Sequence, residues 1–343
     1  MVVMSTSLSS DFKSRILDQL DLVDFHLYSQ GDCLENKRVL FVSEVNDLGY
    51  DLGLLSILER LKKDNVKIQN SLGALIIKSS GELYTKSFAQ NLLFQFNQMG
   101  MGFLGHGVVE ITQDYGNFKT WTKTMDMSLE DICFYHCNDL IQRLMTFKIP
   151  SGKKVLALHS SERRTSNTLG LWHLVEKNLS NLGIDSQEIY VKNGEIVDCI
   201  GCPFETCINF GKVNSCFYND LMVEEVLPAV KVSDVVVWIC PNYNDSISAN
   251  LLAVINRLTV LYRQMSFHEK AFYAVVVSGN SGSDALAKQL IGALNINKGF
   301  YLPPNFVIMA TANAPLKVLT LEGIEARAFE MAKGIKKYLL SEG

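Results

Sequence analysis

Short apolar runs alternate with longer segments of helical periodicity from Lys153 to the end of the chain. This alternation is typical of a parallel sheet with helices on both faces, because each crossover between parallel strands needs a connecting segment such as a helix. The sequence therefore predicts a doubly wound α/β domain. We expect its strands at 154–158, 187–191, 234–240, 270–277 and 305–311, and its helices at 167–182, 219–230, 246–263, 283–296 and 321–340.

Three of these strands are followed by loops rich in hydroxyl, amide and glycine residues. The loops read HSSERRTSNT after 154–158, PNYNDS after 234–240 and SGNSGSD after 270–277. Ligands bind doubly wound sheets at the carboxyl ends of the strands, where such loops meet. We expect the three loops to converge on one crevice.

The first loop has the composition of a phosphate site. The apolar strand Val155–Leu158 runs into a turn whose hydroxyls and amides lie where a helix N-terminus exposes unpaired N–H groups. Arg163 and Arg164 could neutralise phosphate charge or lie in water as ordinary surface residues. The alternative interpretation is a plain helix cap that binds no ligand. An anionic ligand is the first hypothesis because the other two loops accompany this one.

The first part of the chain repeats the later half of this pattern. RVLFVSEVND (38–47) resembles VVWICPNYND (236–245), and LLSILERL resembles LLAVINRL. Further pairs follow in the same order, about 195 to 198 residues apart, which indicates an internal duplication. We expect a degenerate α/β domain at 1–150 and a ligand-binding α/β domain at 151–343, separated by the KIPSGK turn.

We expect the first domain to be incomplete. The segment Met1–Lys37 suggests a helix at Asp11–Leu20 and a short strand at Asp24–Tyr28, but no counterpart of the phosphate loop. Glu44 stands where the later domain has the polar loop after its 234–240 strand, so a negative charge would face a bound phosphate. We therefore predict that this domain does not bind the ligand by itself.

The bulk composition narrows the class of protein. The chain has 343 residues, of which 48% are hydrophobic and 20% charged, as in ordinary globular proteins, and this length favours two domains. Its net charge of −4 comes from interspersed charges, so we expect neither nucleic acid nor a membrane surface as a partner. No apolar run has the length of a membrane span, and the start MVVMSTSLSS does not resemble an export signal. We expect a cytoplasmic protein.

Half of the eight cysteines lie in one short stretch with the spacing C-x2-C-x4-C-x8-C. Four thiolates in one loop would suffice for a [4Fe-4S] cluster or a structural zinc ion, and they could also be unliganded thiols. The candidate metal ligands are Cys199, Cys202, Cys207 and Cys216. The remaining cysteines, which are most simply packing residues, are Cys33, Cys133, Cys137 and Cys240.

These motifs, taken together, resemble the NADPH-dependent FMN reductase family of flavodoxin-like proteins, and within it the branch that includes the iron-sulfur flavoproteins. The resemblance runs from Lys153 to about Leu340 and covers the HSSERRTSNT loop, the cysteine loop, the DVVVWICPNYNDSISANLLAVINRL segment and the SGNSGSD loop. Three features depart from the family pattern. His159 stands where glycine is usual, Asn256 replaces an aspartate, and the second gap between cysteines is longer.

The resemblance implies a flavodoxin-like fold for the second domain, a degenerate and incomplete version of it for the first, and bound FMN. It implies that the FMN phosphate is held by Ser160, Arg163, Ser166, Asn167 and Thr168. The isoalloxazine ring would be lined on one side by Pro241, Asn242, Tyr243 and Asn244, and on the other by Ser278, Gly279, Asn280 and Gly282. The His159 ring either points away from this site or donates a hydrogen bond to the flavin edge.

By the same resemblance, the expected activity is the transfer of electrons from NAD(P)H through FMN to a small acceptor such as a quinone or a flavin. The flavin would carry the redox chemistry, so no catalytic acid or base is expected. One alternative is an electron-transfer flavoprotein, with or without an iron-sulfur cluster, that serves a protein partner. Another is a non-catalytic two-domain scaffold with a decayed flavin site. The chain would act as a homo-oligomer, or as an intramolecular pseudo-dimer if the first domain replaces a missing subunit.

Overall fold

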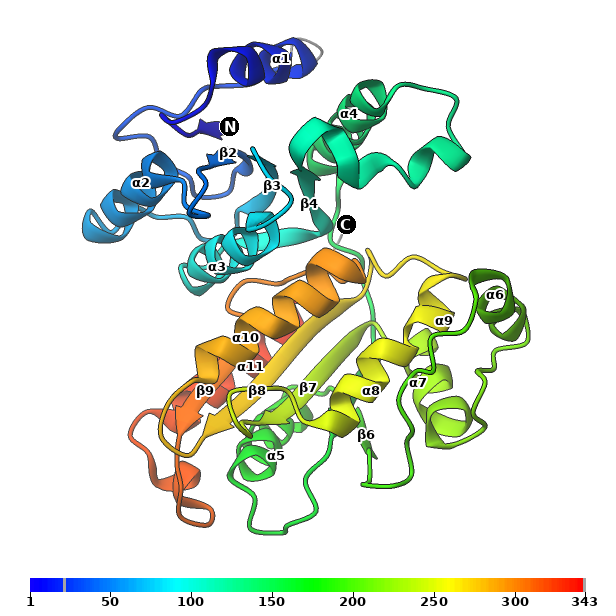
Figure 1. Ribbon diagram of the computed structural model, residues 1–343. Coiled ribbons are helices and arrows are strands. Elements are labelled where there is room, and N and C mark those ends of the chain that lie inside the picture. The colour runs from blue at the N-terminus through cyan, green and yellow to red at the C-terminus, as the bar shows by residue number, and fades with distance from the viewer. Residues whose placement is uncertain (21–22, 342–343) are drawn as a thin grey trace. The chain divides into compact units, whose positions relative to one another are not determined.

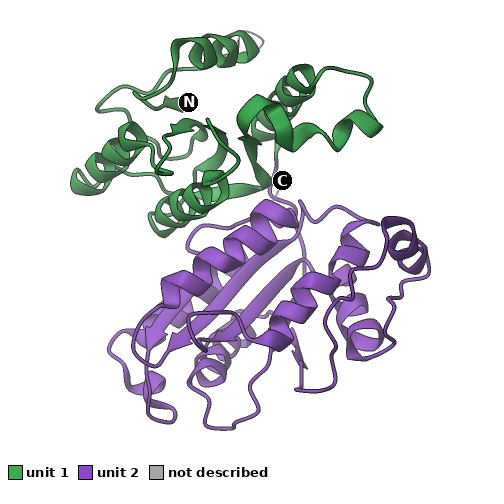
Figure 2. Ribbon diagram, in the orientation of Figure 1, with its two compact units in different colours: residues 1–147 green, residues 148–343 purple. Residues whose placement is uncertain are grey.

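The computed structural model describes residues 1–20 and 23–341 of the chain. These residues form two compact units, an N-terminal unit at 1–147 and a C-terminal unit at 148–343 (Figure 2). None of the described helices is long and apolar enough to cross a membrane. Each unit is a parallel sheet with its own helices.

The C-terminal unit contains a single parallel sheet with the strand order β6-β5-β7-β8-β9 (Figure 1). Its strands are β5 (Val155–His159), β6 (Ser186–Tyr190), β7 (Val235–Pro241), β8 (Ala271–Ser278) and β9 (Val307–Thr311). The order 2-1-3-4-5 is that of flavodoxin-like doubly wound sheets. The predicted fold class is confirmed, and the order places the topological switch point between β5 and β7.

The helices cover both faces of this sheet. Figure 1 shows α8 and α10 on the near face, while α5 and α11 pack against each other behind it. The helices are α5 (Asn167–Asn181), α6 (Phe204–Lys212), α7 (Leu227–Val232), α8 (Ala249–Arg257), α9 (Thr259–Tyr262), α10 (Ser283–Leu290) and α11 (Ile324–Leu339). Every residue of β5, β7 and β8 is buried, which explains why these strands are nearly continuous apolar runs.

The observed helices differ from the predicted ones in two places. The helix expected at 246–263 is divided between α8 and α9, and the one expected at 219–230 becomes a π-helical turn at Met222–Val226 followed by α7. In addition, α6 lies inside the cysteine loop, where no helix was expected. Further π and 3-10 turns occupy Ile291–Asn297 and Lys317–Thr320.

The N-terminal unit has a parallel sheet with the order β1-β2-β3-β4. Its strands are β1 (Val2–Met4), β2 (Arg38–Val45), β3 (Leu72–Ser79) and β4 (Gly102–Ile111), and its helices are α1 (Ser10–Leu20), α2 (Leu52–Lys63), α3 (Thr85–Gln98) and α4 (Leu129–Thr146). Short 3-10 turns lie at Gln113–Phe118 and Trp121–Lys123. Residues of α1 and α4 share one apolar cluster with β1, β2 and β3, just as α5 and α11 pack together in the other unit.

The start of the N-terminal unit corrects one expectation. We expected no counterpart of the phosphate loop in Met1–Lys37, but β1 leads through Ser5–Ser9 into α1 and pairs in parallel with β2. On its other edge, Val2 exchanges hydrogen bonds with the backbone of His26 and Tyr28, both 2.8 Å long. These residues occupy the place of β6. The unit therefore repeats the strand order of the C-terminal sheet in shortened form.

The two sheets match residue by residue at the switch point. Met4, the last residue of β1, pairs with Val42, and His159, the last residue of β5, pairs with Ile239. Val42 and Ile239 are 197 positions apart (239 − 42). The residues that cap α2 and α8, Asp51 and Ser248, are also 197 positions apart (248 − 51). Consequently Ser5, which follows β1, corresponds to Ser160, which follows β5.

Candidate functional site

The switch point of the C-terminal unit is lined by hydroxyl groups. Ser160 follows β5, and Ser248 lies between β7 and α8. The Oγ atoms of these two serines are 2.8 Å apart. Crevices of this kind, at the carboxyl ends of two strands whose connections diverge, bind the phosphate of nucleotide cofactors. Ser248 had not been identified from the sequence, because it lies outside the three loops that drew attention.

The remaining phosphate-loop residues lead into the N-terminus of α5. The Ser166 hydroxyl accepts a hydrogen bond from the Leu169 N–H at 3.3 Å and donates one to Ser161 Oγ at 3.2 Å. Thr168 is buried in the first turn, while Arg163 is exposed on the loop. The free N–H groups and positive end of a fifteen-residue helix favour an anion at this position.

The side chain of Asn167 is occupied by contacts within the protein. Its side-chain amide donates to the carbonyls of Ala312 at 3.1 Å and Ala314 at 2.9 Å, and its Oδ1 accepts from the Val318 N–H at 3.0 Å. The side chain therefore anchors the segment after β9 to the start of α5. Only the backbone N–H of Asn167 is placed to serve an anion at the helix end.

The loops after β7 and β8 are joined by one amide. Asn242 Nδ2 is placed to donate to Ser278 Oγ at 2.9 Å, to the Ser281 carbonyl at 3.0 Å and to Asp245 Oδ1 at 3.0 Å. Its Oδ1 accepts from the Asp245 N–H at 2.8 Å. Asn242 thus links the two loops that the sequence assigned to opposite sides of the flavin ring.

The loop after β7 holds an exposed aromatic ring on a tight turn. Pro241 ends β7 and is buried, whereas Tyr243 is 61% exposed. Asn244 and Asp245 both have left-handed backbone angles, with φ of 56° and 54°, as the central residues of a type I′ turn require. An exposed aromatic ring is suited to stacking on a planar ligand.

The loop after β8 depends on one glycine. Gly282 has φ of +85°, and a Cβ on it would lie 2.0 Å from Asp245 Oδ1. Gly279 and Asn280 are exposed, and a Cβ on Gly279 would meet no atom closer than 3.8 Å. Ser278 is fully buried, with its Oγ 2.6 Å from Ser283 Oγ. The close approach of the two loops therefore requires glycine at 282.

His159 is turned away from the phosphate loop. Its buried ring stacks on Tyr190 with 4.9 Å between centroids and 6° between planes, and its Nε2 lies 3.4 Å from Glu188 Oε1. Both contacts are to β6. This geometry favours the first of the two interpretations of His159 over a flavin-edge hydrogen bond.

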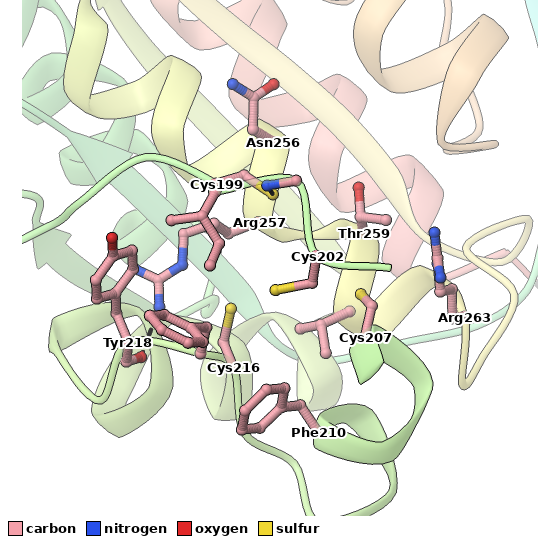
Figure 3. Close-up of a pocket in the computed structure, with 14 residues that line it drawn as sticks. Cys199, Cys202, Cys207, Phe210, Cys216, Tyr218, Asn256, Arg257, Thr259 and Arg263 are labelled. Carbon is pink, nitrogen blue, oxygen red and sulfur yellow. Dashed lines mark hydrogen bonds between the residues drawn. The ribbon is translucent and has the colours of Figure 1, made fainter. Parts of the chain in front are cut away.

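The four clustered cysteines line one cavity of about 180 Å³. Figure 3 shows Cys202, Cys207 and Cys216 turned toward one another, with Cys199 above them in the view. Burial raises the pKa of the Cys207 thiol, the Arg263 guanidinium opposes this, and the other three thiols raise it further. The four cysteines that the sequence offers as candidate metal ligands thus line the same cavity.

Arg257 holds this loop in place, a role that sequence reasoning missed. Its fully buried guanidinium donates to Asp220 Oδ2 at 2.5 Å, to the Val197 carbonyl at 3.1 Å and to the Tyr218 carbonyl at 2.8 Å. Burial alone would lower the pKa of Arg257, but its hydrogen bonds with Asp220 and Cys216 outweigh it. Asn256, its neighbour, donates to Asp198 Oδ1 at 2.9 Å. These contacts join both ends of the loop to α8.

The cysteine cavity does not have the geometry of a preformed mononuclear metal site. Three or more ligand atoms within 4.8 Å of one another occur at one place among the described residues, and that place is outside the cysteine loop. A single zinc ion needs ligand atoms about this close, because Zn–S bonds are only ~2.3 Å long.

In the N-terminal unit, the equivalent of the phosphate site is filled by carboxylates. Asp51 is 1% exposed, and its oxygens accept from Ser5 Oγ at 2.5 Å, Leu54 N–H at 3.0 Å, Ser43 Oγ at 2.8 Å and Glu44 N–H at 3.3 Å. The Glu44 carboxylate accepts from the N–H of Ser9, just before α1, at 2.7 Å. The Ser5 hydroxyl and the Ser9 N–H of the loop are thus already paired with carboxylates of the chain itself.

Comparison with known proteins finds a matching family for part of the C-terminal unit. Residues 153–314 match the model of the NADPH-dependent FMN reductase family. No curated protein sequence matches the chain. Solved structures with a similar fold include an FMN-dependent NADH-azoreductase from Bacillus anthracis in complex with FMN (11% identity, 53% of this chain and 99% of that one, TM-score 0.39). Another is an NAD(P)H:quinone oxidoreductase from Methanothermobacter marburgensis (13% identity, 57% of this chain and 98% of that one, TM-score 0.38).

Similarity at this level of identity does not transfer an activity. The family match covers the phosphate loop, the cysteine loop and the loops after β7 and β8, and it ends shortly after β9. Residues 153–314, slightly less than half of the chain, therefore resemble the NADPH-dependent FMN reductase family.

Proposed function

We propose that the C-terminal unit binds FMN at the switch point between β5 and β7 and passes electrons from NAD(P)H to a small acceptor such as a quinone or a free flavin. The observation that carries this proposal is the Ser160–Ser248 hydroxyl pair at the switch point, next to the N-terminus of α5. The family match over 153–314 supports the same assignment.

The residues present fit FMN by their chemistry. Hydroxyls of Ser160, Ser166 and Ser248 and the N–H groups of the first turn of α5 suit a phosphate, and Arg163 adds a positive charge at the mouth of the loop. Thr168 supports the turn from its buried position. The proposed phosphate site thus has hydrogen-bond donors and a positive charge. It has Ser248 at the position where the N-terminal unit has the carboxylate of Asp51.

The flavin ring would lie between the two loops that Asn242 joins. Tyr243 offers its exposed ring for stacking, while the exposed residues Asn244, Gly279 and Asn280 would contact the polar ring edge. Bound FMN supplies hydride and electron chemistry. The protein's own residues bind the phosphate, orient the ring and fix the distance between the two loops.

Anaerobic reduction of the FMN-loaded protein tests the proposal. Rapid bleaching of the flavin absorption by NADPH or NADH supports the NAD(P)H oxidoreductase. Bleaching only by a low-potential chemical reductant would instead favour an electron-transfer flavoprotein for a protein partner. A protein that fails to bind FMN at all would contradict both flavoprotein proposals and would favour the non-catalytic two-domain scaffold.

The cysteine cavity favours a second candidate, an iron-sulfur flavoprotein. Four thiols share one cavity, and Arg257 and Arg263 line it, so that positive charge would offset an anionic cluster. Iron and acid-labile sulfide assayed on anaerobically purified protein decide between the two. Stoichiometric iron and sulfide would favour the second candidate, and their absence would leave a simple FMN reductase.

The assembly in which this unit works is a separate proposal. The internal repeat suggests an intramolecular pseudo-dimer, in which the N-terminal unit takes the role of a second subunit. Sedimentation velocity on the full chain tests this proposal. A pseudo-dimer would sediment as a monomer of the chain, and a homo-oligomer would sediment as a larger species.

A further inference from the structure

One group of imidazole and carboxylate side chains lies outside the cofactor crevice. His173 and Glu176 are on α5 at the spacing that places two side chains on the same helix face, and Glu188 is on β6. Their ligand atoms all lie within 4.8 Å of one another. No other group of three or more histidine, cysteine or acidic ligands meets this condition in the described part of the chain.

The distances from the two histidine rings to the Glu188 carboxylate are long for hydrogen bonds. The Nε2 of His173 lies 3.4 Å from Glu188 Oε2, and the Nε2 of His159 lies 3.4 Å from Glu188 Oε1. Both exceed the ~2.7–3.2 Å usual for N–H···O hydrogen bonds. Ligand atoms bound tetrahedrally at ~2.0 Å from a zinc ion are about 3.3 Å apart, so the His173–Glu188 pair has the separation that a common metal ion would impose.

The two carboxylates are held in orientation by other side chains. Trp172 Nε1 donates to Glu188 Oε2 at 2.8 Å, and Ser186 Oγ donates to Glu176 Oε1 at 3.0 Å. The 6% exposed side chain of His159 faces the second oxygen of Glu188. Hydrogen bonds from residues behind the ligands are a regular feature of metal centres, because they fix the ligand atoms before the ion arrives.

We propose that His173, Glu176 and Glu188 bind a divalent transition-metal ion, with Zn²⁺ as the preferred ion and water in the remaining position. One imidazole nitrogen with two carboxylates matches the ligands of zinc, whereas Mg²⁺ and Ca²⁺ favour oxygen ligands alone. His159 is a positioning residue that acts through Glu188. The ion would join α5 to β6, the two elements that follow β5 in the chain.

Metal titration of the full chain tests this site. The experiment must distinguish metal bound by His173, Glu176 and Glu188 from metal bound by the cysteines. Co²⁺ serves as the probe, because thiolate ligands add a charge-transfer absorption in the near ultraviolet and nitrogen and oxygen ligands do not. We expect the wild-type protein to bind one equivalent of Co²⁺ without thiolate absorption, and Zn²⁺ to displace it. We expect the His173→Ala and Glu176→Gln variants not to bind this equivalent of Co²⁺. Any thiolate charge-transfer absorption that the wild-type protein shows should remain in both variants.

The matched control is His26→Ala. His26 lies 3.0 Å from Asp32 in the N-terminal unit, a histidine–carboxylate pair without a third ligand, so this variant should bind like wild type. Ser186→Ala should weaken binding by about 10-fold or more, since it frees Glu176. His173 is half exposed, so its loss should leave the far-ultraviolet circular dichroism unchanged. Equal stoichiometry in wild type and His173→Ala, or thiolate absorption for every bound ion, would overturn the proposal.

Discussion

The carboxylate of Asp51 accepts a hydrogen bond of 2.5 Å from the hydroxyl of Ser5. In the C-terminal unit the corresponding contact joins two hydroxyls, Ser160 and Ser248, 2.8 Å apart. The two units thus have a strand, a loop and a helix in the same order at the switch point, but the contact there is neutral in one unit and contains a carboxylate in the other. One site offers hydroxyl groups to an anion, and the other already contains a buried carboxylate.

Transfer of that carboxylate to the C-terminal unit should abolish FMN binding. Ser248→Asp places a negative charge beside the expected phosphate, and like-charge contacts cost several kcal/mol, so we expect at least about 100-fold weaker FMN binding in a fluorescence titration. Ser248→Ala should weaken it far less, because it adds no charge. Ser180→Asp, at an exposed position near the end of α5, is the control for net charge. Unchanged affinity in Ser248→Asp would place the phosphate elsewhere.

Removal of the carboxylate from the N-terminal unit should destabilise that unit. Asp51→Ala leaves the buried hydroxyls of Ser5 and Ser43 and the Leu54 N–H without their acceptor, at a cost of about 1–3 kcal/mol. Asp51→Asn keeps a capping oxygen and should cost less. Hydrogen exchange of β1 and β2 amides measures the effect. Protection equal to wild type in Asp51→Ala would show that these hydrogen bonds do not matter.

The two glycines of the loop after β8 should differ in their tolerance of alanine. Gly282→Ala forces a side chain into a left-handed backbone and onto Asp245, so we expect a loss of about 1–3 kcal/mol in stability and weaker flavin binding. Gly279→Ala, in the same loop with open space around it, should leave the thermal stability of the FMN-free protein close to wild type. Thermal unfolding with and without FMN compares them. Equal effects would mean that the Asn242-linked loops separate easily.

Acid should weaken the N-terminal unit partly through Glu44. Burial would raise the pKa of this carboxyl, but hydrogen bonds from Ser9 and the charge of Lys78 outweigh it and leave the pKa below its ordinary value of 4.5. A lowered pKa in the folded state contributes stability above the unfolded-state pKa, and this contribution disappears as the pH falls through the folded-state pKa.

Glu44→Gln should therefore be less stable than wild type at neutral pH and should lose less stability on acidification below about pH 4.5. Glu59→Gln, on the exposed face of α2, is the matched control and should follow wild type. Chemical unfolding of the full chain at several pH values gives the comparison. Parallel pH profiles for Glu44→Gln and wild type would refute the role of Glu44.

The central strands were predictable from sequence because burial on both faces gives them continuous apolar runs. The strand expected at 234–240 is observed at Val235–Pro241, and that at 270–277 at Ala271–Ser278. The three-residue β1 was missed, since its pairing with Arg38–Val45 comes from tertiary contacts and leaves no periodic signal. Its loop also lacks the arginines that had marked the phosphate loop.

Side-chain roles within the site were less predictable than the loops themselves. The residue types of Asn167 and Asn242 suggested ligand contacts, but their amides join distant loops. Arg257 was noted in a motif without a role, because its partners Val197, Tyr218 and Asp220 come together only when the cysteine loop folds over α8. Such contacts between residues far apart in the chain cannot be deduced from local spacing.

The stoichiometry of FMN on the full chain tests the account most directly. The hydroxyl-lined switch point of the C-terminal unit and the carboxylate-filled one of the N-terminal unit together predict one FMN per chain, and none in Ser248→Asp. Absorption of the released flavin against protein concentration, after reconstitution and gel filtration, gives the number. Two FMN per chain, or FMN retained in Ser248→Asp, would contradict the account.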